Sequence, residues 1–369
     1  MNQRLQRLRD IGQSLWLDNI TRDLLDSGTL ARYVEEYGLT GLTSNPTIFD
    51  EALAAGTAYD AGIRDKHAAG MDGEALFTEL ALEDLRRAAD LFRPAHQASD
   101  GVDGWVSMEL SPLLASDTDS SIEAAARIHR QAARDNLFIK IPGTPEGVPA
   151  IEESIRNGVP INVTLLFSAD QYIAVAEAYM RAIERRIEAG RDPVVHSVAS
   201  LFVSRWDKAI ADKVPDGLRN GLGIAAGQRT YRAYRDMLAS ERWKQLAAAG
   251  ARPQRLLWAS TSTKDPAAPD TLYATALAAP DTIDTMPEKT LRAFADHGEL
   301  HGAMRKDGGD CDAMLAKYAE AGIDVDALAV QLQQEGTASF TKSWGELLQR
   351  IDDKIATVAA PATKRERQA

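Results

Sequence analysis

The sequence predicts an α/β fold, and within that class a (β/α)8 TIM barrel with additional helices. Three observations predict it. Short apolar runs alternate with helical segments, helix start and stop signals separate them, and no low-complexity linker interrupts the series. This alternation is typical of a parallel sheet whose strands are joined by crossover helices.

Eight segments fit the strands of such a barrel. Each is a short apolar run bounded by turn or cap signals. They are Ser14–Asp18, Gly41–Ser44, Gly104–Leu110, Asn136–Ile141, Pro160–Phe167, Val194–Phe202, Arg255–Ser260 and Thr282–Thr285.

Helix signals separate the middle strands. Thr144-Pro145 predicts a helix N-terminus, because threonine caps helices and proline suits the first helical position. Asn157-Gly158 predicts the end of that helix. Capping-box patterns at Ser120–Glu123 and Ser168–Gln171 predict the starts of two further helices.

The organisation along the chain favours one barrel domain over residues 1–358. We expect extra helices inserted between Lys208 and Gln254 and added after Leu291, with a closing helix at Gly345–Val358. Residues 359–369 read as a disordered tail. The active site of such a barrel lies at the carboxyl ends of its strands, so polar residues there become the candidates.

Composition excludes some classes of partner. With 42 Lys+Arg and 54 Asp+Glu the formal net charge is −12, which argues against nucleic-acid and anionic-membrane binding. The single cysteine, Cys311, fits a reducing compartment. No signal peptide or membrane span is visible, so we expect a cytoplasmic protein. The sequence does not determine the oligomeric state, and a homodimer is compatible with it.

Lys140 is the first candidate for chemistry. It lies in an apolar strand between Ile139 and Ile141. Lysine is rarely buried unless it is paired or functional. Burial favours the neutral amine, which can attack a ketone and form an imine. The alternative is a lysine on an edge strand or in a structural ion pair.

Two carboxylates stand at predicted strand ends. Asp18 closes the first strand, and Glu109 lies near the end of the third. Such a pair could serve as acid and base. The alternative for each is that it caps a helix or pairs with an arginine.

Polar side chains on two other strands could face a substrate. Thr43 and Asn45 follow the second strand, where Asn-Pro is also an ordinary turn signal. Asn162 and Thr164 alternate with apolar residues on the fifth strand, so both face one side, which in a barrel is the interior. Buried polar groups need partners, and substrate or water could supply them.

A phosphate site is predicted after the sixth and seventh strands. Ser200 and Arg205 stand at the sixth, and Ser260, Ser262 and Lys264 follow the seventh. Hydroxyls and a cation near the last strands are a recurring phosphate site of barrels. The alternative is a polar surface loop.

Taken together, four segments resemble the transaldolases, and the match covers most of the chain from about Asp18. They are Gly41-Leu-Thr-Ser-Asn-Pro-Thr-Ile-Phe49, Asn136-Leu-Phe-Ile-Lys-Ile-Pro-Gly143, Ile161-Asn-Val-Thr-Leu-Leu-Phe167 and Ser200-Leu-Phe-Val-Ser-Arg205. The insertions and the version of the seventh strand in Leu257–Lys264 are similar to the longer bacterial branch of that family.

The resemblance implies transfer of a dihydroxyacetone unit between phosphorylated sugars, with no cofactor and no metal. The implied catalytic residues are Lys140 as the Schiff-base lysine, Asp18 as the acid/base at the C4 hydroxyl, and Glu109 with Thr164 as holders of a catalytic water. The implied substrate residues are Thr43, Asn45, Asn162 and Ser200 for the dihydroxyacetone moiety and Arg205 and Ser260 for the phosphate.

The chain departs from the family at one position. Many transaldolases place an arginine two residues after the serine of the seventh-strand loop, where this chain has Ser262. We expect Lys264 to take over as a phosphate ligand, with Ser260 and Ser262 donating hydrogen bonds. The alternative is that Lys264 is a solvated loop residue.

Two other functions remain open at this point. One is a class I aldolase, which releases dihydroxyacetone instead of transferring it. The other is a silent barrel that only binds sugar phosphates, which the joint presence of Lys140, Asp18 and Glu109 disfavours.

Overall fold

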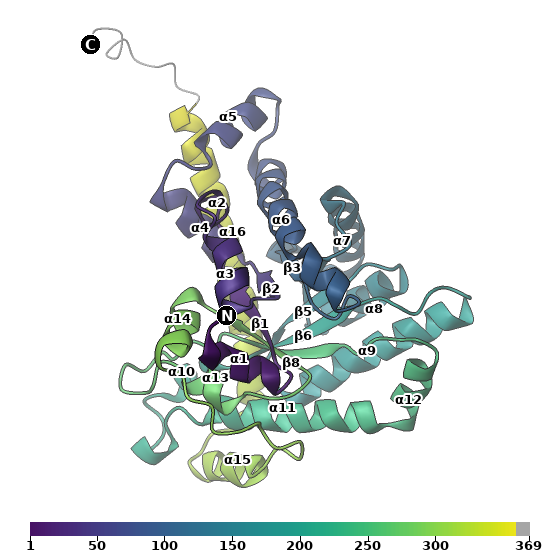
Figure 1. Cartoon of the computed structure of the whole chain (residues 1–369), viewed down its shortest axis with the longest axis vertical. Coiled ribbons are helices and arrows are strands. Elements are labelled where there is room, and N and C mark those ends of the chain that lie inside the picture. Colours follow the sequence, from purple (N-terminus) through teal and green to yellow (C-terminus); the bar gives the residue numbers. More distant parts are fainter. Residues whose placement is uncertain (359–369) are drawn as a thin grey trace.

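The computed structural model describes residues 1–358, and eight parallel strands of that range form a closed barrel in sequence order (Figure 1). The strands are β1 (Ser14–Asp18), β2 (Gly41–Thr43), β3 (Trp105–Glu109), β4 (Leu137–Pro142), β5 (Ile161–Leu166), β6 (Ser197–Phe202), β7 (Arg255–Ala259) and β8 (Thr282–Met286). The predicted fold class is confirmed. The predicted tail, 359–369, lies outside the described residues, and the assignment of 1–358 to one domain stays a prediction.

Every strand lies within three residues of its predicted bounds. The largest difference is in β6, which begins at Ser197 and not at Val194. The wall closes because β1 pairs with β8 as well as with β2.

Helices follow each strand and fill the insertions. They are α1 (Gln3–Asp10), α2 (Arg22–Asp26), α3 (Thr29–Tyr37), α4 (Pro46–Ala55), α5 (Asp60–Ala68), α6 (Gly73–Ala98), α7 (Thr118–Ala132), α8 (Gly147–Arg156), α9 (Ala169–Glu188), α10 (Ser204–Ile210), α11 (Leu222–Ala239), α12 (Glu241–Ala248), α13 (Leu272–Ala276), α14 (Glu288–His297), α15 (Cys311–Glu320) and α16 (Val325–Val358). Two short 3-10 turns, η1 (Pro112–Leu114) and η2 (Asp216–Leu218), complete the series. The insertion predicted between Lys208 and Gln254 therefore holds α11 and α12.

One of the three predicted helix caps is confirmed, because Ser168 and Gln171 form the capping box at the start of α9. The prediction at Thr144 was two residues too early, since the N-cap of α8 is Glu146 and the helix begins at Gly147. The Thr144 hydroxyl still accepts a hydrogen bond from the Gly147 amide. The prediction at Ser120 was wrong, because Asp117 caps α7 three residues earlier and accepts from the Ser120 amide.

The closing helix is much longer than predicted. The sequence places it at Gly345–Val358, whereas α16 spans Val325–Val358. Its first half contains Gly336 and several β-branched or hydroxyl residues, which lower helix propensity. Packing of this half against β5, where Gln333 and Gly336 contact Leu165, overrides that local preference. In Figure 1 this helix is the long yellow one that runs past the barrel.

The barrel interior is a packed core. The rings of Trp16 in β1 and Phe138 in β4 lie 6.3 Å apart, and these strands are not neighbours in the wall. The two side chains therefore meet across the interior. Because side chains alternate along a strand, Asp18 and Lys140, two residues further on, face the same interior at its carboxyl end.

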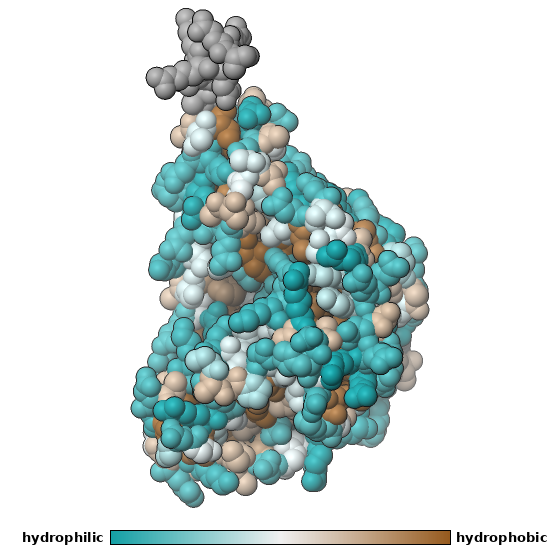
Figure 2. Space-filling model, turned by 60° about the vertical axis from the view of Figure 1, so that its left-hand side comes forward, coloured by the Kyte–Doolittle hydropathy of each residue, from teal (hydrophilic) through white to brown (hydrophobic). Residues whose placement is uncertain are grey.

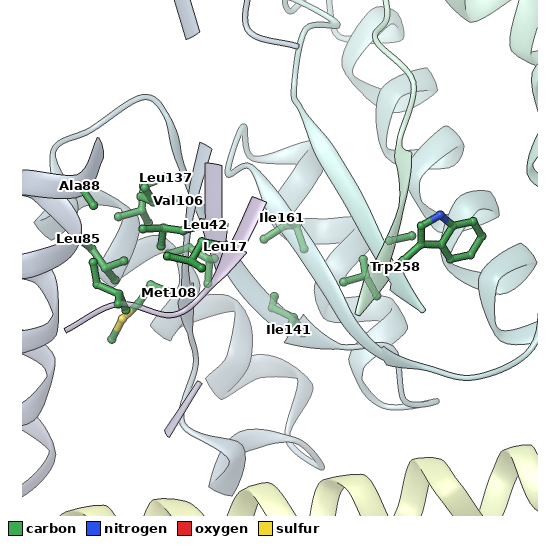
Figure 3. Packing of buried hydrophobic residues seen from close by; sticks show 14 of the residues in the cluster. Leu17, Leu42, Leu85, Ala88, Val106, Met108, Leu137, Ile141, Ile161 and Trp258 are labelled. Atoms are coloured by element: carbon green, nitrogen blue, oxygen red, sulfur yellow. The ribbon is translucent and has the colours of Figure 1, made fainter. Parts of the chain in front are cut away.

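The outer face of the wall packs against the helices. Figure 3 shows Leu85 and Ala88 of α6 beside Val106, Met108 and Leu137 of β3 and β4. All of these side chains are buried in the main hydrophobic cluster. This layer fixes the strands that carry the site.

The surface view in Figure 2 is mostly hydrophilic, with hydrophobic residues scattered over it. Within the described part of the chain, no helix combines the length and the hydropathy that a membrane crossing requires.

Candidate active site

Lys140 and Glu109 form a buried pair at the carboxyl end of the barrel. They are register partners on β4 and β3, and each is 6% exposed. Lys140 Nζ donates to Glu109 Oε2 at 2.6 Å and to the Ser44 carbonyl at 3.0 Å. Burial raises the pKa of Glu109, and the charge of Lys140 opposes that rise. The Lys140 amine therefore lies beside a carboxylate that accepts protons readily.

Asn162 and Thr164 on β5 are completely buried, as their alternation predicts. Asn162 Nδ2 donates to Ser107 Oγ at 3.1 Å, and Ser200 Oγ donates to Asn162 Oδ1 at 2.7 Å. Thr164 Oγ1 has no hydrogen-bond partner within residues 1–358. A buried hydroxyl of this kind needs a water or a ligand.

Asp18 lies at the same end of the interior. Thr43 donates to Asp18 Oδ1 at 2.7 Å, and the Thr43 and Thr285 hydroxyls are hydrogen-bonded at 2.7 Å. Burial raises the pKa of Asp18, and the nearby charge of Lys140 and the Thr43 hydrogen bond lower it by a smaller amount. The site thus places two carboxylates with raised pKa around one lysine.

Asn45 occupies the turn that its Asn-Pro signal predicts. It is the N-cap of α4, and its Oδ1 accepts from the Ile48 amide at 3.1 Å. Its Nδ2 donates no hydrogen bond within the described residues, and its contact with a substrate hydroxyl stays a prediction.

Arg205 supplies a cation at the carboxyl end of β6. Its Cζ lies 5.0 Å from the ring centroid of Phe202 and 5.7 Å from that of Phe340. Burial lowers its pKa, and the charge of Glu335 opposes this. It forms no ion pair or hydrogen bond with any residue of the described range. Two aromatic rings hold the guanidinium while its N–H donors stay available.

The loop after β7 brings the other predicted phosphate ligands near Arg205. Ser260 has a left-handed backbone (φ 57°), and its hydroxyl lies 2.9 Å from that of Ser204. Lys264 Nζ donates to Ser262 Oγ at 2.6 Å. The Lys264 side chain stays exposed, but partial loss of its solvent lowers its pKa, and the charges of Lys208 and Arg205 lower it further. Repulsion of this kind shows that the cations converge.

Two cavities in the described residues bear on where the site lies. One of about 330 Å³ is lined by Ser204, Lys208 and Lys264, next to the phosphate candidates. Another of about 800 Å³ lies beside α13 and α14, and none of the predicted site residues lines it. We place the site at the barrel end, because the buried pairs that can do chemistry are there.

Four residues of this end escaped the sequence analysis. Ser107 and Thr285 were detectable, since Ser107 lies two residues before Glu109 on the same face and Thr285 ends the eighth predicted strand. Gln333 and Phe340 carried no local signal, because they reach the site from the part of α16 that was not predicted.

In the described residues, no group of three or more His, Cys, Asp or Glu side chains is arranged to hold a metal ion. His297 interacts with Asp270 and Asp296 at the surface.

Comparison with known proteins identifies the family of the chain. A family model described as Transaldolase/Fructose-6-phosphate aldolase matches residues 15–351. The "Transaldolase" of Thermobifida fusca is 44% identical over 96% of this chain and 99% of its own length. The "Transaldolase" of Mycolicibacterium smegmatis is 43% identical (96% and 98% covered), and "Transaldolase 2" of Nostoc punctiforme is 39% identical (96% and 98% covered). With a model that spans nearly the whole described chain and relatives matched along their full length, the chain belongs to the transaldolase family.

Proposed function

We propose that this transaldolase transfers a dihydroxyacetone unit through a Schiff base at Lys140. The donor is sedoheptulose 7-phosphate or fructose 6-phosphate, and the acceptor is glyceraldehyde 3-phosphate or erythrose 4-phosphate. The observation that carries the proposal is the buried Lys140–Glu109 pair, with Asp18 on the same interior surface.

The first step is imine formation. The Lys140 amine must lose a proton, and Glu109, 2.6 Å away with a raised pKa, accepts it. The neutral amine attacks the C2 ketone, and the oxygen leaves as water after two proton transfers. Glu109 relays these protons through a water held by Thr164, whose hydroxyl has no partner within residues 1–358.

The second step is cleavage of the C3–C4 bond. Asp18 takes the proton of the C4 hydroxyl, an aldehyde forms at C4, and the electron pair of the broken bond moves into the iminium. The product is an enamine on Lys140 and a free aldose phosphate. An acceptor aldehyde then reverses the step: the enamine attacks its carbonyl carbon, Asp18 returns the proton, and water hydrolyses the new imine.

Substrate binding follows from the polar groups around this centre. Thr43, Asn45, Asn162 and Ser200 hold the hydroxyls of the dihydroxyacetone unit. Arg205, Ser260, Ser262 and Lys264 hold the phosphate, with Lys264 in place of the usual arginine. The support for this is that Arg205 and Lys264 lie close enough for their charges to interact. A cytoplasmic location and a homodimer stay predictions.

The test of the covalent step is trapping. Borohydride added with fructose 6-phosphate should inactivate the enzyme and leave a reduced three-carbon adduct on Lys140, located by peptide mass spectrometry. Lys140→Ala should form no adduct and show no turnover, with an unchanged circular dichroism spectrum. An adduct on a different lysine would refute the assignment.

Aldolase activity is the second candidate function, because the matching family model carries both names. Mixing fructose 6-phosphate with erythrose 4-phosphate should yield sedoheptulose 7-phosphate. With fructose 6-phosphate alone, free dihydroxyacetone should accumulate only slowly. Rapid release over many turnovers without an acceptor would favour the aldolase.

A further inference from the structure

The helix α16 reaches the carboxyl end of the barrel from outside the (β/α)8 pattern. It packs against β5 and the short turn η1, and further along against α4 and α5 (Figure 1). Three of its residues, Gln333, Gly336 and Phe340, are spaced three and four residues apart and so share one face of the helix. We call the segment 333–340 the strap.

Gln333 joins two strand ends. Its Nε2 donates to the carbonyl of Gly143, directly after β4, and to the carbonyl of Leu165 in β5, both at 3.0 Å. Its side chain is buried. These two strands carry Lys140 and Thr164, so one amide group fixes the spacing between the lysine strand and the strand of the unpartnered hydroxyl.

The backbone that Gln333 holds is unusual. Leu165 has φ 58°, a left-handed conformation that is costly for a non-glycine residue inside a strand. The pairing of β5 with β6 shifts register between Val163 and Leu166 at the same place. Thr164 lies inside this irregularity, and its direction into the barrel depends on it.

The rest of the strap contacts Leu165 and Arg205. A methyl group on Gly336 would lie 2.9 Å from Leu165 Cδ2 and 3.2 Å from Arg205 Nη1, so the helix approaches both closely. Phe340 covers the Arg205 guanidinium at 5.7 Å. One helix face therefore touches the support of Thr164 and the phosphate cation.

We propose that the strap positions two parts of the site separately. Gln333 is a positioning residue for the water site of Thr164, and Phe340 is a positioning residue for Arg205. This inference rests on the proposed function, because it uses the roles of Thr164 and Arg205 given there. It adds residues that neither the barrel pattern nor the local sequence indicates.

The first experiment separates the rate of imine formation from the affinity for phosphate. Gln333→Met keeps the length of the side chain and removes both donors. Single-turnover borohydride trapping on Lys140 should slow by roughly tenfold to a hundredfold, the range for a small misplacement of a reacting group. The KM for fructose 6-phosphate should change little. The control is Gln334→Met, the same substitution at an exposed neighbour, which should match the parent enzyme.

Phe340→Leu should give the opposite result. Loss of the ring should raise the KM for phosphorylated substrates by roughly threefold to tenfold, while trapping at saturating substrate keeps its rate. If α16 only stabilised the fold, both variants would lower Tm and change kcat and KM together, and that outcome would overturn the proposal.

A double-mutant cycle tests the route through Thr164. If Gln333 acts by aiming Thr164, then Gln333→Met combined with Thr164→Val should be no slower than Thr164→Val alone. Effects that multiply would refute the proposal. If trapping is slow in Thr164→Val and normal in Gln333→Met, the proposed role of the strap is refuted but that of Thr164 is not. A normal Thr164→Val enzyme refutes the proposed role of Thr164 and the strap with it.

A second substitution tests the same contacts if Gln333→Met does not fold. Gly336→Ala favours the helix but adds a methyl against Leu165 and Arg205, whereas Gly345→Ala on the same helix meets open space. The first should slow trapping and raise KM, and the second should change neither. Equal kinetics for the two alanine variants would overturn the inference.

Discussion

The two ends of the barrel interior both contain charged groups, but they differ in how these groups are partnered. At the amino end, Arg255 donates to Ser14 Oγ and to the carbonyls of Thr282 and Val102. Asp103 accepts from Ser14 and from the indole of Trp16 and lies 3.6 Å from Arg255. The donors and acceptors of this cluster satisfy one another.

At the carboxyl end the partnering is incomplete. Thr164 has an unpartnered hydroxyl within residues 1–358, and Arg205 forms no ion pair or hydrogen bond in the same range, although the charge of Glu335 is near. Asp18 and Glu109 keep raised pKa values although Lys140 is near. Unsatisfied buried groups cost free energy, so this end carries a cost that a substrate can relieve. The comparison teaches that the charged groups of the interior are satisfied by one another at the amino end and are left available at the carboxyl end, where barrel enzymes bind their substrates.

The largest effect on turnover should come from Asp18→Asn. A general acid–base group typically contributes about 10²–10⁴-fold, so turnover should fall by that range while imine trapping on Lys140 persists. In the parent enzyme, kcat/KM should fall as the pH drops through the raised pKa of Asp18, above the ordinary value of 3.8. Near-normal turnover of the variant would assign the base to another residue.

The same variant should not lose stability. Because the folded-state pKa of Asp18 is raised, the folded chain binds the proton more tightly than the unfolded chain, and stability falls as pH rises through this range. Asparagine removes that cost and can still accept the Thr43 hydrogen bond. Tm at pH 7 should therefore be equal or higher, with Asp352→Asn, at an exposed position inside α16, as the unchanged control.

The amino end should behave in the opposite way. Arg255→Met leaves Asp103, whose side chain is only 16% exposed, without its cation, and breaking such a pair costs roughly 3 kcal/mol of unfolding free energy. The kcat and KM of the folded enzyme should not change. Urea unfolding would measure the loss. The matched control is Arg252→Met, whose partner Asp100 is largely exposed, and it should cost about 1 kcal/mol or less.

If Arg255→Met lowered kcat without lowering stability, the two ends would not divide the roles in this way, and the comparison would fail.

The same contrast explains how much the sequence could predict. The strand segments were predictable, because alternation and turn signals are local. Lys140, Asp18, Glu109 and Asn162 were predictable as candidates, since a polar side chain inside an apolar strand is itself a signal. The residues that hold them in place were harder to find, because each acts through a partner distant in sequence.

Gln333 is the clearest case. Its two hydrogen bonds reach carbonyls 190 and 168 residues earlier in the chain. No periodicity reports such a contact, and the glycine at 336 lowers helix propensity where the contact needs a helix. The cap of α7 is a smaller error. Asp117, three residues before the capping-box pattern at Ser120–Glu123, caps the helix in its place.

The smallest effect should come from Lys264, at the rim of the carboxyl end. Lys264 donates to Ser262 and is exposed, as a phosphate ligand at the rim or a solvated loop residue would be. The charges favour a ligand, because Lys264, Lys208 and Arg205 converge in a chain whose net charge is −12. A dianionic phosphate would relieve their repulsion.

Lys264→Ala should therefore raise the KM for phosphorylated sugars by roughly tenfold or more, since a charge-assisted hydrogen bond is worth about 1.5–3 kcal/mol. Activity on unphosphorylated analogues should change little, because the dihydroxyacetone contacts lie deeper in the barrel. Lys213→Ala, on the segment after α10, serves as a control for the loss of one positive charge. A KM that rises equally for both kinds of substrate, or for neither, would mean that Arg205 and the serines hold the phosphate without Lys264. The carboxyl end would then contain fewer cations that need a phosphate partner than its charges suggest.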